Sequence, residues 1–222
     1  MPGSVLTEEL VIPDVSGGGP GGKGGAGGPG EPGGGGPSGG ARAVPQRAYL
    51  TGISLALGAI LMFFMAFVSA YIVRKGTAGD WQPFELPRIL WGTTLVLLIS
   101  SVTIERARAA MGRSDQEGFL RWWRITTVLG LAFLAGQLLA WRQLAAAGVY
   151  LATNPASSFF YLLTAAHGAH LLGGIVALVA VAVRNVAPAR MTRATAAEVT
   201  AMYWHFMDGL WIFLFLLLQL GR

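Results

Sequence analysis

Four ionisable side chains lie within long apolar stretches near the C-terminus and are the candidates for chemistry. His167 and His170 are three residues apart, and so are His205 and Asp208. On a helix this spacing places both members of a pair on one face. If the two helices are antiparallel neighbours, a rise of about 1.5 Å per residue puts His167 level with Asp208 and His170 level with His205. Such groups are costly inside a membrane, so we expect them to pair or to serve a function.

Three uses of this cluster are compatible with its residue types. The first is a structural lock, in which the four side chains pair across the two helices, and this is the interpretation we prefer. The second is a proton relay through His and Asp. The third is a zinc, iron or haem site, because His and carboxylate groups are common ligands. Two His on one helix turn rarely suit bis-axial haem, and no flanking motif supports a porphyrin. Because we prefer the structural lock, we expect no catalytic residue, cofactor or metal on this chain.

The composition identifies the kind of protein that must position these residues. Of 222 residues, 53% are hydrophobic and only 12% are charged, against about 25% charged in soluble domains. The chain has no Cys, which excludes disulfides, thiol nucleophiles and Cys-ligated metals. The net charge is +5, but the basic residues flank apolar stretches and form no stripe interleaved with aromatics, so we predict no nucleic-acid partner. These features indicate an integral membrane protein.

The predicted fold class is an all-α membrane protein, a bundle of five transmembrane helices preceded by a disordered Gly-rich tail. A membrane helix needs about 20 apolar residues. Residues 1–47 are rich in Gly and Pro, show no cleavable signal peptide and are predicted to be a flexible cytoplasmic tail. The membrane domain covers 48–222, and its helices are predicted over about 48–73, 89–110, 122–145, 156–184 and 198–220.

The distribution of Lys and Arg predicts the orientation in the membrane. The tail and the second and fourth loops carry 11 of these residues, and the opposite side carries 5. Because basic residues accumulate in cytoplasmic loops, we expect a cytoplasmic N-terminus and an external C-terminus.

Other polar or small residues are assigned structural roles. Ala169, Gly173 and Ala177 form a row of small residues that favours close helix packing. Glu105 is expected to form a surface ion pair, and Glu198 to stabilise a helix N-terminus. No chemistry is assigned to a set of residues expected to bond their own backbone or a neighbour: Ser100, Ser101, Thr103 and Gln137.

The motifs of the last two predicted helices resemble those of one family. Glu198 is followed by Tyr203-Trp204-His205-Phe206-x-Asp208-x-x-Trp211, and the preceding helix carries His167-Gly168-x-His170 with Gly173. These residues resemble subunit III of the haem–copper oxidases of the cytochrome c oxidase type, in its five-helix bacterial form. The resemblance covers about residues 48–222 and leaves out the Gly-rich tail.

The resemblance implies a subunit of an aerobic terminal oxidase in the bacterial cell membrane. It implies oxidase subunits I and II and membrane lipids as partners, with the haems and copper in those partner subunits. The chain itself would be a non-redox subunit that supports subunit I and proton uptake during O2 reduction. One departure is that many members carry a membrane-embedded Glu where this chain has Ile60, so any role of that Glu does not transfer.

Two alternatives remain open at this point. One is a subunit III-like component of a quinol oxidase or nitric oxide reductase system. The electron donor docks on other subunits, so the sequence of this chain does not distinguish these systems. The other is a small transporter or channel, although neither internal repeats nor broken helices are evident.

Overall fold

The computed structural model describes residues 46–77, 79, 81–82, 84–183 and 192–221. These residues form five α-helices and no strand: α1 Gln46–Thr77, α2 Ile89–Gly112, α3 Gln116–Ala146, α4 Pro155–Ala182 and α5 Arg193–Leu220. All five are long and apolar enough to cross a membrane. The predicted all-α fold with five membrane helices is therefore confirmed. The predicted tail lies outside the described residues, except for its last two positions, which already belong to α1.

Two helices begin earlier than hydropathy predicted, because their caps lie among polar residues. The α3 helix begins at Gln116 rather than at about residue 122, since the Asp115 side chain accepts a hydrogen bond from Gly118 N at 2.8 Å. The α5 helix begins at Arg193 rather than at 198, and Thr192 caps it. A capping side chain satisfies backbone N–H groups that the first helical turn leaves free. Both helices therefore continue beyond their apolar part.

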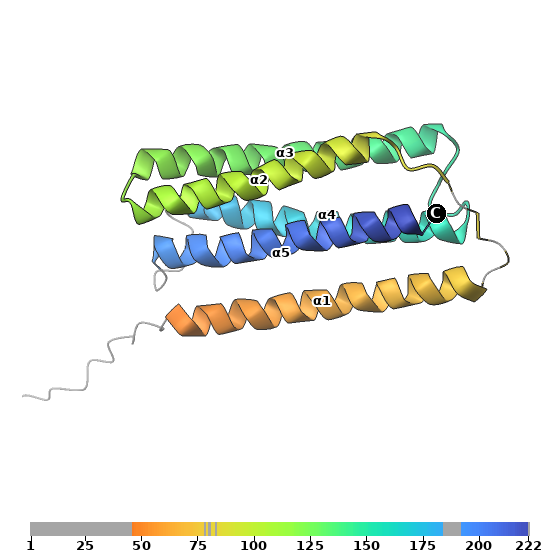
Figure 1. The fold of residues 1–222 in the computed structure, drawn as a ribbon, viewed down its shortest axis with the longest axis horizontal. Helices are drawn as coiled ribbons and strands as arrows, with labels where there is room; N and C mark the ends of the chain where they lie inside the picture. Colours follow the sequence, from red (N-terminus) through yellow and green to blue (C-terminus); the bar gives the residue numbers. More distant parts are fainter. Residues whose placement is uncertain (1–45, 78, 80, 83, 184–191, 222) are drawn as a thin grey trace, which may run out of the picture. The chain divides into compact units, whose positions relative to one another are not determined.

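The backbone of α5 lies close to those of α1, α2 and α4 (Figure 1), and its Trp211 side chain also contacts Phe133 of α3. The α2 helix packs along α3, and α3 in turn packs against α4. Among the described helices, α1 contacts only α4 and α5, and its buried residues are Phe64, Val68 and Tyr71. Residues at the centre of the bundle therefore come mainly from α2 to α5.

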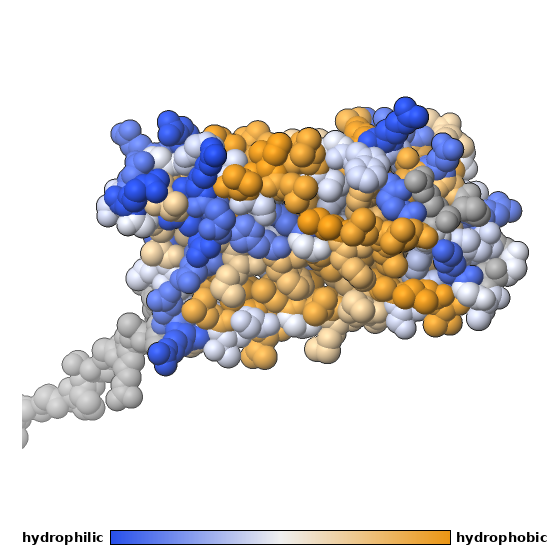
Figure 2. Space-filling model, viewed as in Figure 1, coloured by the Kyte–Doolittle hydropathy of each residue, from blue (hydrophilic) through white to orange (hydrophobic). Residues whose placement is uncertain are grey.

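Hydrophobic side chains form a broad band between two more hydrophilic ends (Figure 2). Many large apolar side chains of the helices are exposed, including Leu55, Met62 and Val128. Exposed apolar surface of this kind suits contact with lipid acyl chains rather than with water. The interior is filled by aromatic side chains, of which Trp123, Trp204 and Trp211 are the largest.

Two glycines allow helices to approach Trp204 closely. A Cβ atom on Gly130 of α3 would lie 2.6 Å from the Cη2 atom of Trp204, and one on Gly174 of α4 would lie 3.0 Å from the Tyr203 ring. The predicted row of small residues does not provide this packing, because Ala169 and Gly173 are exposed. The small residue that faces α5 is Gly174, one position further along the helix.

Candidate functional site

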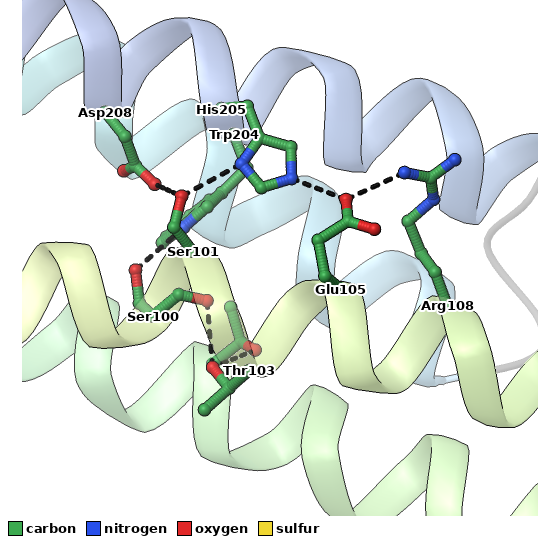
Figure 3. Close-up of polar contacts among 9 residues, drawn as sticks. Ser100, Ser101, Thr103, Glu105, Arg108, Trp204, His205 and Asp208 are labelled. Carbon is green, nitrogen blue, oxygen red and sulfur yellow. Dashed lines mark hydrogen bonds and ion pairs between the residues drawn. The ribbon is translucent and has the colours of Figure 1, made fainter.

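The α2 and α5 helices present complementary polar side chains to each other. On α2, Ser101 and Glu105 are four residues apart and Arg108 follows three residues later, so all three share one face. On α5, His205 and Asp208 share a face in the same way. Figure 3 shows the two sets pointing toward one another across the interface.

These five side chains form an unbroken series of hydrogen bonds (Figure 3). Ser101 Oγ lies 2.6 Å from Asp208 Oδ2 and 2.9 Å from His205 Nδ1. On the other side of the imidazole, His205 Nε2 lies 2.7 Å from Glu105 Oε1. Arg108 donates to the same Glu105 oxygen at 2.7 Å. We call the series Arg108–Glu105–His205–Ser101–Asp208 the polar chain.

The polar chain runs from the surface of the bundle to its interior. The side chains of Arg108, Glu105 and His205 are 38%, 49% and 35% exposed, whereas Asp208 is only 3% exposed. Beside His205 lies an open apolar groove to which α1 contributes Leu61 and Met65. The polar chain therefore connects an exposed carboxylate with a buried carboxyl group.

Further polar contacts fix the position of α2. Trp204 Nε1 donates to Ser100 Oγ at 2.9 Å, and Trp211 Nε1 donates to Thr94 Oγ1 at 3.0 Å. These two bonds flank the polar chain along α5. Because each one satisfies a buried indole N–H that would otherwise be costly, they hold α2 and α5 in the register that the polar chain requires.

The two histidines of α4 lie in different surroundings. His167 is fully buried, with its ring centroid 5.0 Å from that of Trp211, and its ring nitrogens have no hydrogen-bond partner among the described residues. His170 Nδ1 lies 2.8 Å from the carbonyl oxygen of Ala166. Its ring also contacts Phe64 of α1 at a centroid distance of 5.4 Å.

The predicted pairing of these histidines with His205 and Asp208 is wrong. Within the described part of the chain, no hydrogen bond joins the two sets. The expected depths agree with the structure, because Tyr203 on α5 donates to the carbonyl of His170 at 2.7 Å and Trp211 lies beside His167. The prediction was wrong about which helix the His205 and Asp208 side chains face. The α5 helix has several neighbours, and these two side chains face α2 instead of α4.

Sequence reasoning missed Ser101 and Glu105 as partners of the cluster. Glu105 does form the expected ion pair with Arg108, but it also binds His205. The spacings show that Ser101 and Glu105 share one face of their helix, as His205 and Asp208 do. They do not show that these two faces meet.

Glu198 and the two motif glycines contribute to helix contacts. Glu198 accepts a hydrogen bond from Gln46 Nε2 of α1 at 2.6 Å. It lies past the first turn of α5, which begins at Arg193, so the expected role at the N-terminus does not apply. A Cβ on Gly168 would lie 3.8 Å from Leu134, and one on Gly173 would lie 3.9 Å from Tyr203. Both distances are ordinary contacts, and neither glycine is required by steric crowding.

No group of three or more His, Cys, Asp or Glu residues within the described ranges is placed to hold a metal ion. The four predicted site residues separate into the polar chain and the two α4 histidines, so they do not converge as one set of ligands. What the polar chain can do chemically is join helices and hold or pass protons, because each of its members donates or accepts hydrogen bonds.

Comparison with known proteins identifies the family. The family model described as cytochrome c oxidase subunit III matches residues 44–220, which include all five helices. The chain belongs to the cytochrome c oxidase subunit III family. It is 34% identical over 175 residues to cytochrome c oxidase subunit 3 of Synechocystis sp., a match that covers 76% of this chain and 74% of that protein.

Two further relatives show similar identity. The probable cytochrome c oxidase subunit 3 of Mycobacterium bovis is 36% identical over 171 residues, covering 75% of this chain and 84% of the relative. That of Nocardia farcinica is 36% identical over 169 residues, covering 74% and 83%. The chain is thus a membrane-embedded subunit III of a haem–copper oxidase, an oxidoreductase complex. The quinol oxidase, nitric oxide reductase and transporter alternatives are not favoured.

Proposed function

We propose that this subunit III braces oxidase subunit I in the bacterial cell membrane, next to subunit II, while the haems and copper are carried by those partners. The observation that supports this most is the extent of the family match, which spans every helix of the membrane domain. The family-typical residues mainly join helices in this structure: Trp204 and Trp211 bond α2, Tyr203 bonds α4, and Glu198 bonds α1. The bonds made by Trp204, Trp211 and Tyr203 are buried or partly buried, and they give a rigid body that suits a bracing subunit.

The polar chain contributes to this rigidity. Ser101 bonds both His205 and Asp208, and Glu105 bonds His205, so α2 and α5 are joined by three hydrogen bonds in this segment. Within a membrane, an unpaired polar group lacks the alternative of bonding water. Separating α2 from α5 would therefore expose several groups at once, which favours a single packing of the bundle.

We further propose that the N-terminal tail lies in the cytoplasm and that the C-terminus lies outside. The support is the excess of Lys and Arg on the tail side. An odd number of membrane helices then places the two ends of the membrane domain on opposite sides. A reporter enzyme fused after the last residue is expected to be active only outside the cell; activity only in the cytoplasm would refute this orientation.

The membrane lipids are proposed as further partners of the outer face. Large apolar side chains remain exposed on helices at the edge of the bundle, among them Leu55 and Met62 of α1. Acyl chains can cover such surface without loss of hydrogen bonds.

Affinity purification of the tagged chain from native membranes tests the oxidase assignment. We expect a co-purifying haem-bearing subunit and a copper-bearing one, and an absorbance spectrum with haem bands from the complex. The chain expressed and purified alone should show no haem bands and no stoichiometric metal. Isolation from native membranes without any haem subunit, or haem bound to the lone chain, would contradict the proposal.

A pair of Asp208 variants tests the bracing role. Asp208→Leu removes the acceptor of Ser101 at a buried position, so we expect less subunit I to co-purify. Asp208→Asn preserves shape and a hydrogen-bonding oxygen and should retain most of the assembly. Equal recovery of subunit I with both variants and the wild type would show that this contact does not matter for bracing.

A further inference from the structure

We propose that Glu105, His205, Ser101 and Asp208 form a proton wire that passes one mobile proton between the surface of the bundle and buried Asp208. This inference goes beyond the bracing role and does not depend on the partners of the subunit. It rests on the continuity of the polar chain, in which every donor–acceptor distance from Glu105 to Asp208 lies between 2.6 and 2.9 Å. These distances are typical of strong hydrogen bonds that involve O–H or charged groups.

The number of protons follows from the donors and acceptors. Three hydrogen bonds link the four side chains, and each bond needs one proton. The hydroxyl of Ser101 supplies one, and a neutral imidazole of His205 supplies a second. With both carboxyl groups ionised, no third proton is available. The observed geometry therefore requires one additional proton, shared among Glu105, His205 and Asp208.

The additional proton can be bound at three positions without movement of any heavy atom. When it sits on Glu105, the acid donates to His205 Nε2, Nδ1–H donates to Ser101, and Ser101 donates to ionised Asp208. When it sits on His205, the imidazolium donates to Glu105 and to Ser101. When it sits on Asp208, the acid donates to Ser101, Ser101 donates to Nδ1, and Nε2–H donates to ionised Glu105. Between Glu105 and His205 one O–H bond breaks and one N–H bond forms. Between His205 and Asp208 two protons move, because Ser101 takes the Nδ1 proton and gives its own hydroxyl proton to Asp208. Charge and protons balance in both steps.

The surroundings favour one such proton. Arg108 contributes a single positive charge next to Glu105, so the set of two carboxyl groups, one imidazole and one guanidinium is neutral when one additional proton is present. In the groove beside His205, α1 presents the apolar Leu61 and Met65. The histidines of α4 make no hydrogen bond to the polar chain among the described residues. At the buried end of the polar chain, where Asp208 is only 3% exposed, the low dielectric disfavours net charge.

The buried end is suited to holding the proton. Asp208 Oδ2 bonds Ser101, whereas Oδ1 is buried without a hydrogen-bond partner among the described residues. An ionised carboxylate with one unpaired buried oxygen is costly. A neutral acid that donates through Oδ2 leaves only a carbonyl oxygen unpaired, which costs less. Asp208 can thus act as a proton store whose route to the surface runs through Ser101 and His205.

A nitrogen NMR experiment on the full chain in detergent tests the wire. The chain has only 3 His, so ¹⁵N-histidine labelling gives at most three imidazoles, and the shifts of Nδ1 and Nε2 report which nitrogen carries a proton. We expect intermediate shifts at both nitrogens of His205. Asp208→Asn removes one resting place of the proton and should move the His205 Nδ1 resonance, while His167 and His170 resonances stay in place and show that the fold is retained.

Variants of Ser101 distinguish proton transfer through its hydroxyl from a direct electrostatic effect of Asp208 on His205. In a Ser101→Ala background the connection is cut, so Asp208→Asn should no longer move the His205 resonances. In a Ser101→Thr background the hydroxyl is retained, and the response should return. An unchanged His205 spectrum on Asp208→Asn, or an equal response with Ser101→Ala, would overturn the proposal.

A measurement on the unaltered chain covers the case in which Ser101→Ala does not fold. Side chains whose protonation is coupled gain and lose protons in macroscopic steps that belong to the whole set. The ¹⁵N shifts of His205 and the ¹³C shift of the Asp208 carboxyl carbon should therefore change together, in the same steps, when the pH is varied. A change that one of the two groups shows and the other does not would exclude a shared proton.

Discussion

Substitution of Gly130 by Ala tests the packing around Trp204 most directly. The new Cβ would lie 2.6 Å from Cη2 and 3.1 Å from Cζ2 of the indole, whereas carbon atoms in contact are normally about 3.5–4.0 Å apart. The indole would have to move by about 1 Å. Its room to move is small, because Trp204 is fully buried and its Nε1 is bonded to Ser100 at 2.9 Å.

Two opposing effects set the magnitude. Ala is the better helix former by about 0.5–1 kcal/mol, and overpacking in a close-packed interior costs about 1–3 kcal/mol. The overpacking dominates, so we expect Gly130→Ala to lower the free energy of unfolding by about 1–2 kcal/mol. Gly92→Ala is the matched control, since a Cβ atom at this position would have nothing within 4 Å, and it should be neutral or slightly stabilising.

The assay is the midpoint of thermal unfolding of the detergent-purified chain, followed by Trp fluorescence and circular dichroism. A double variant gives the sharper result. Trp204→Phe removes the two indole atoms that clash, so Gly130→Ala should not lower the unfolding midpoint further in that background. Additive losses are expected only for independent sites. The reasoning is refuted if Gly130→Ala behaves like Gly92→Ala, or if its cost is the same in the Trp204→Phe background, where the ring is smaller.

Three further substitutions probe other contacts. Asn154→Ala removes the capping box that Asn154 forms with Ser157 at the start of α4, and should cost about 1 kcal/mol in thermal unfolding. Trp123→Phe removes a buried indole bond to the Leu178 carbonyl at 2.8 Å, and should cost about 1 kcal/mol by the same assay, the net contribution of one hydrogen bond, since this carbonyl keeps its backbone bond within α4. Gln46→Ala removes an exposed bond to α5 and should leave the unfolding midpoint unchanged; a clear drop would show that this contact anchors α1.

Much of the fold could be predicted from the sequence because lipid imposes a simple rule. A membrane helix has to be about 20 apolar residues long. The uncharged stretch after Arg47 meets that requirement, and those after Arg88 and Arg124 are somewhat shorter and are extended by the charged residues at their ends. All five helices could be predicted for this reason. Their ends were less predictable, since α3 and α5 start in polar segments where caps at Asp115 and Thr192, rather than hydropathy, decide the first residue.

The candidate site was only partly predictable, because helical periodicity fixes which residues share a face but not which helix that face meets. The spacing of His205 and Asp208 correctly placed them together, and their depth relative to His170 also agreed with the structure. Their partner helix depends on how α5 packs against α1, α2 and α4. Ser101 is inconspicuous in sequence, since serines in membrane helices commonly bond their own backbone.

The sparse contacts of α1 have a consequence for biogenesis. The ribosome releases α1 first, yet among the described helices it contacts only α4 and α5, and α5 ends at Leu220. At a synthesis rate of about 5–20 residues per second, α1 is in the bilayer for on the order of ten seconds before the synthesis of α5 is complete. It can wait there because a single helix satisfies its own backbone hydrogen bonds. Crosslinking of stalled nascent chains should join α1 to α5 only at the greatest lengths; an early, stable contact of α1 with α2 would contradict this order of assembly.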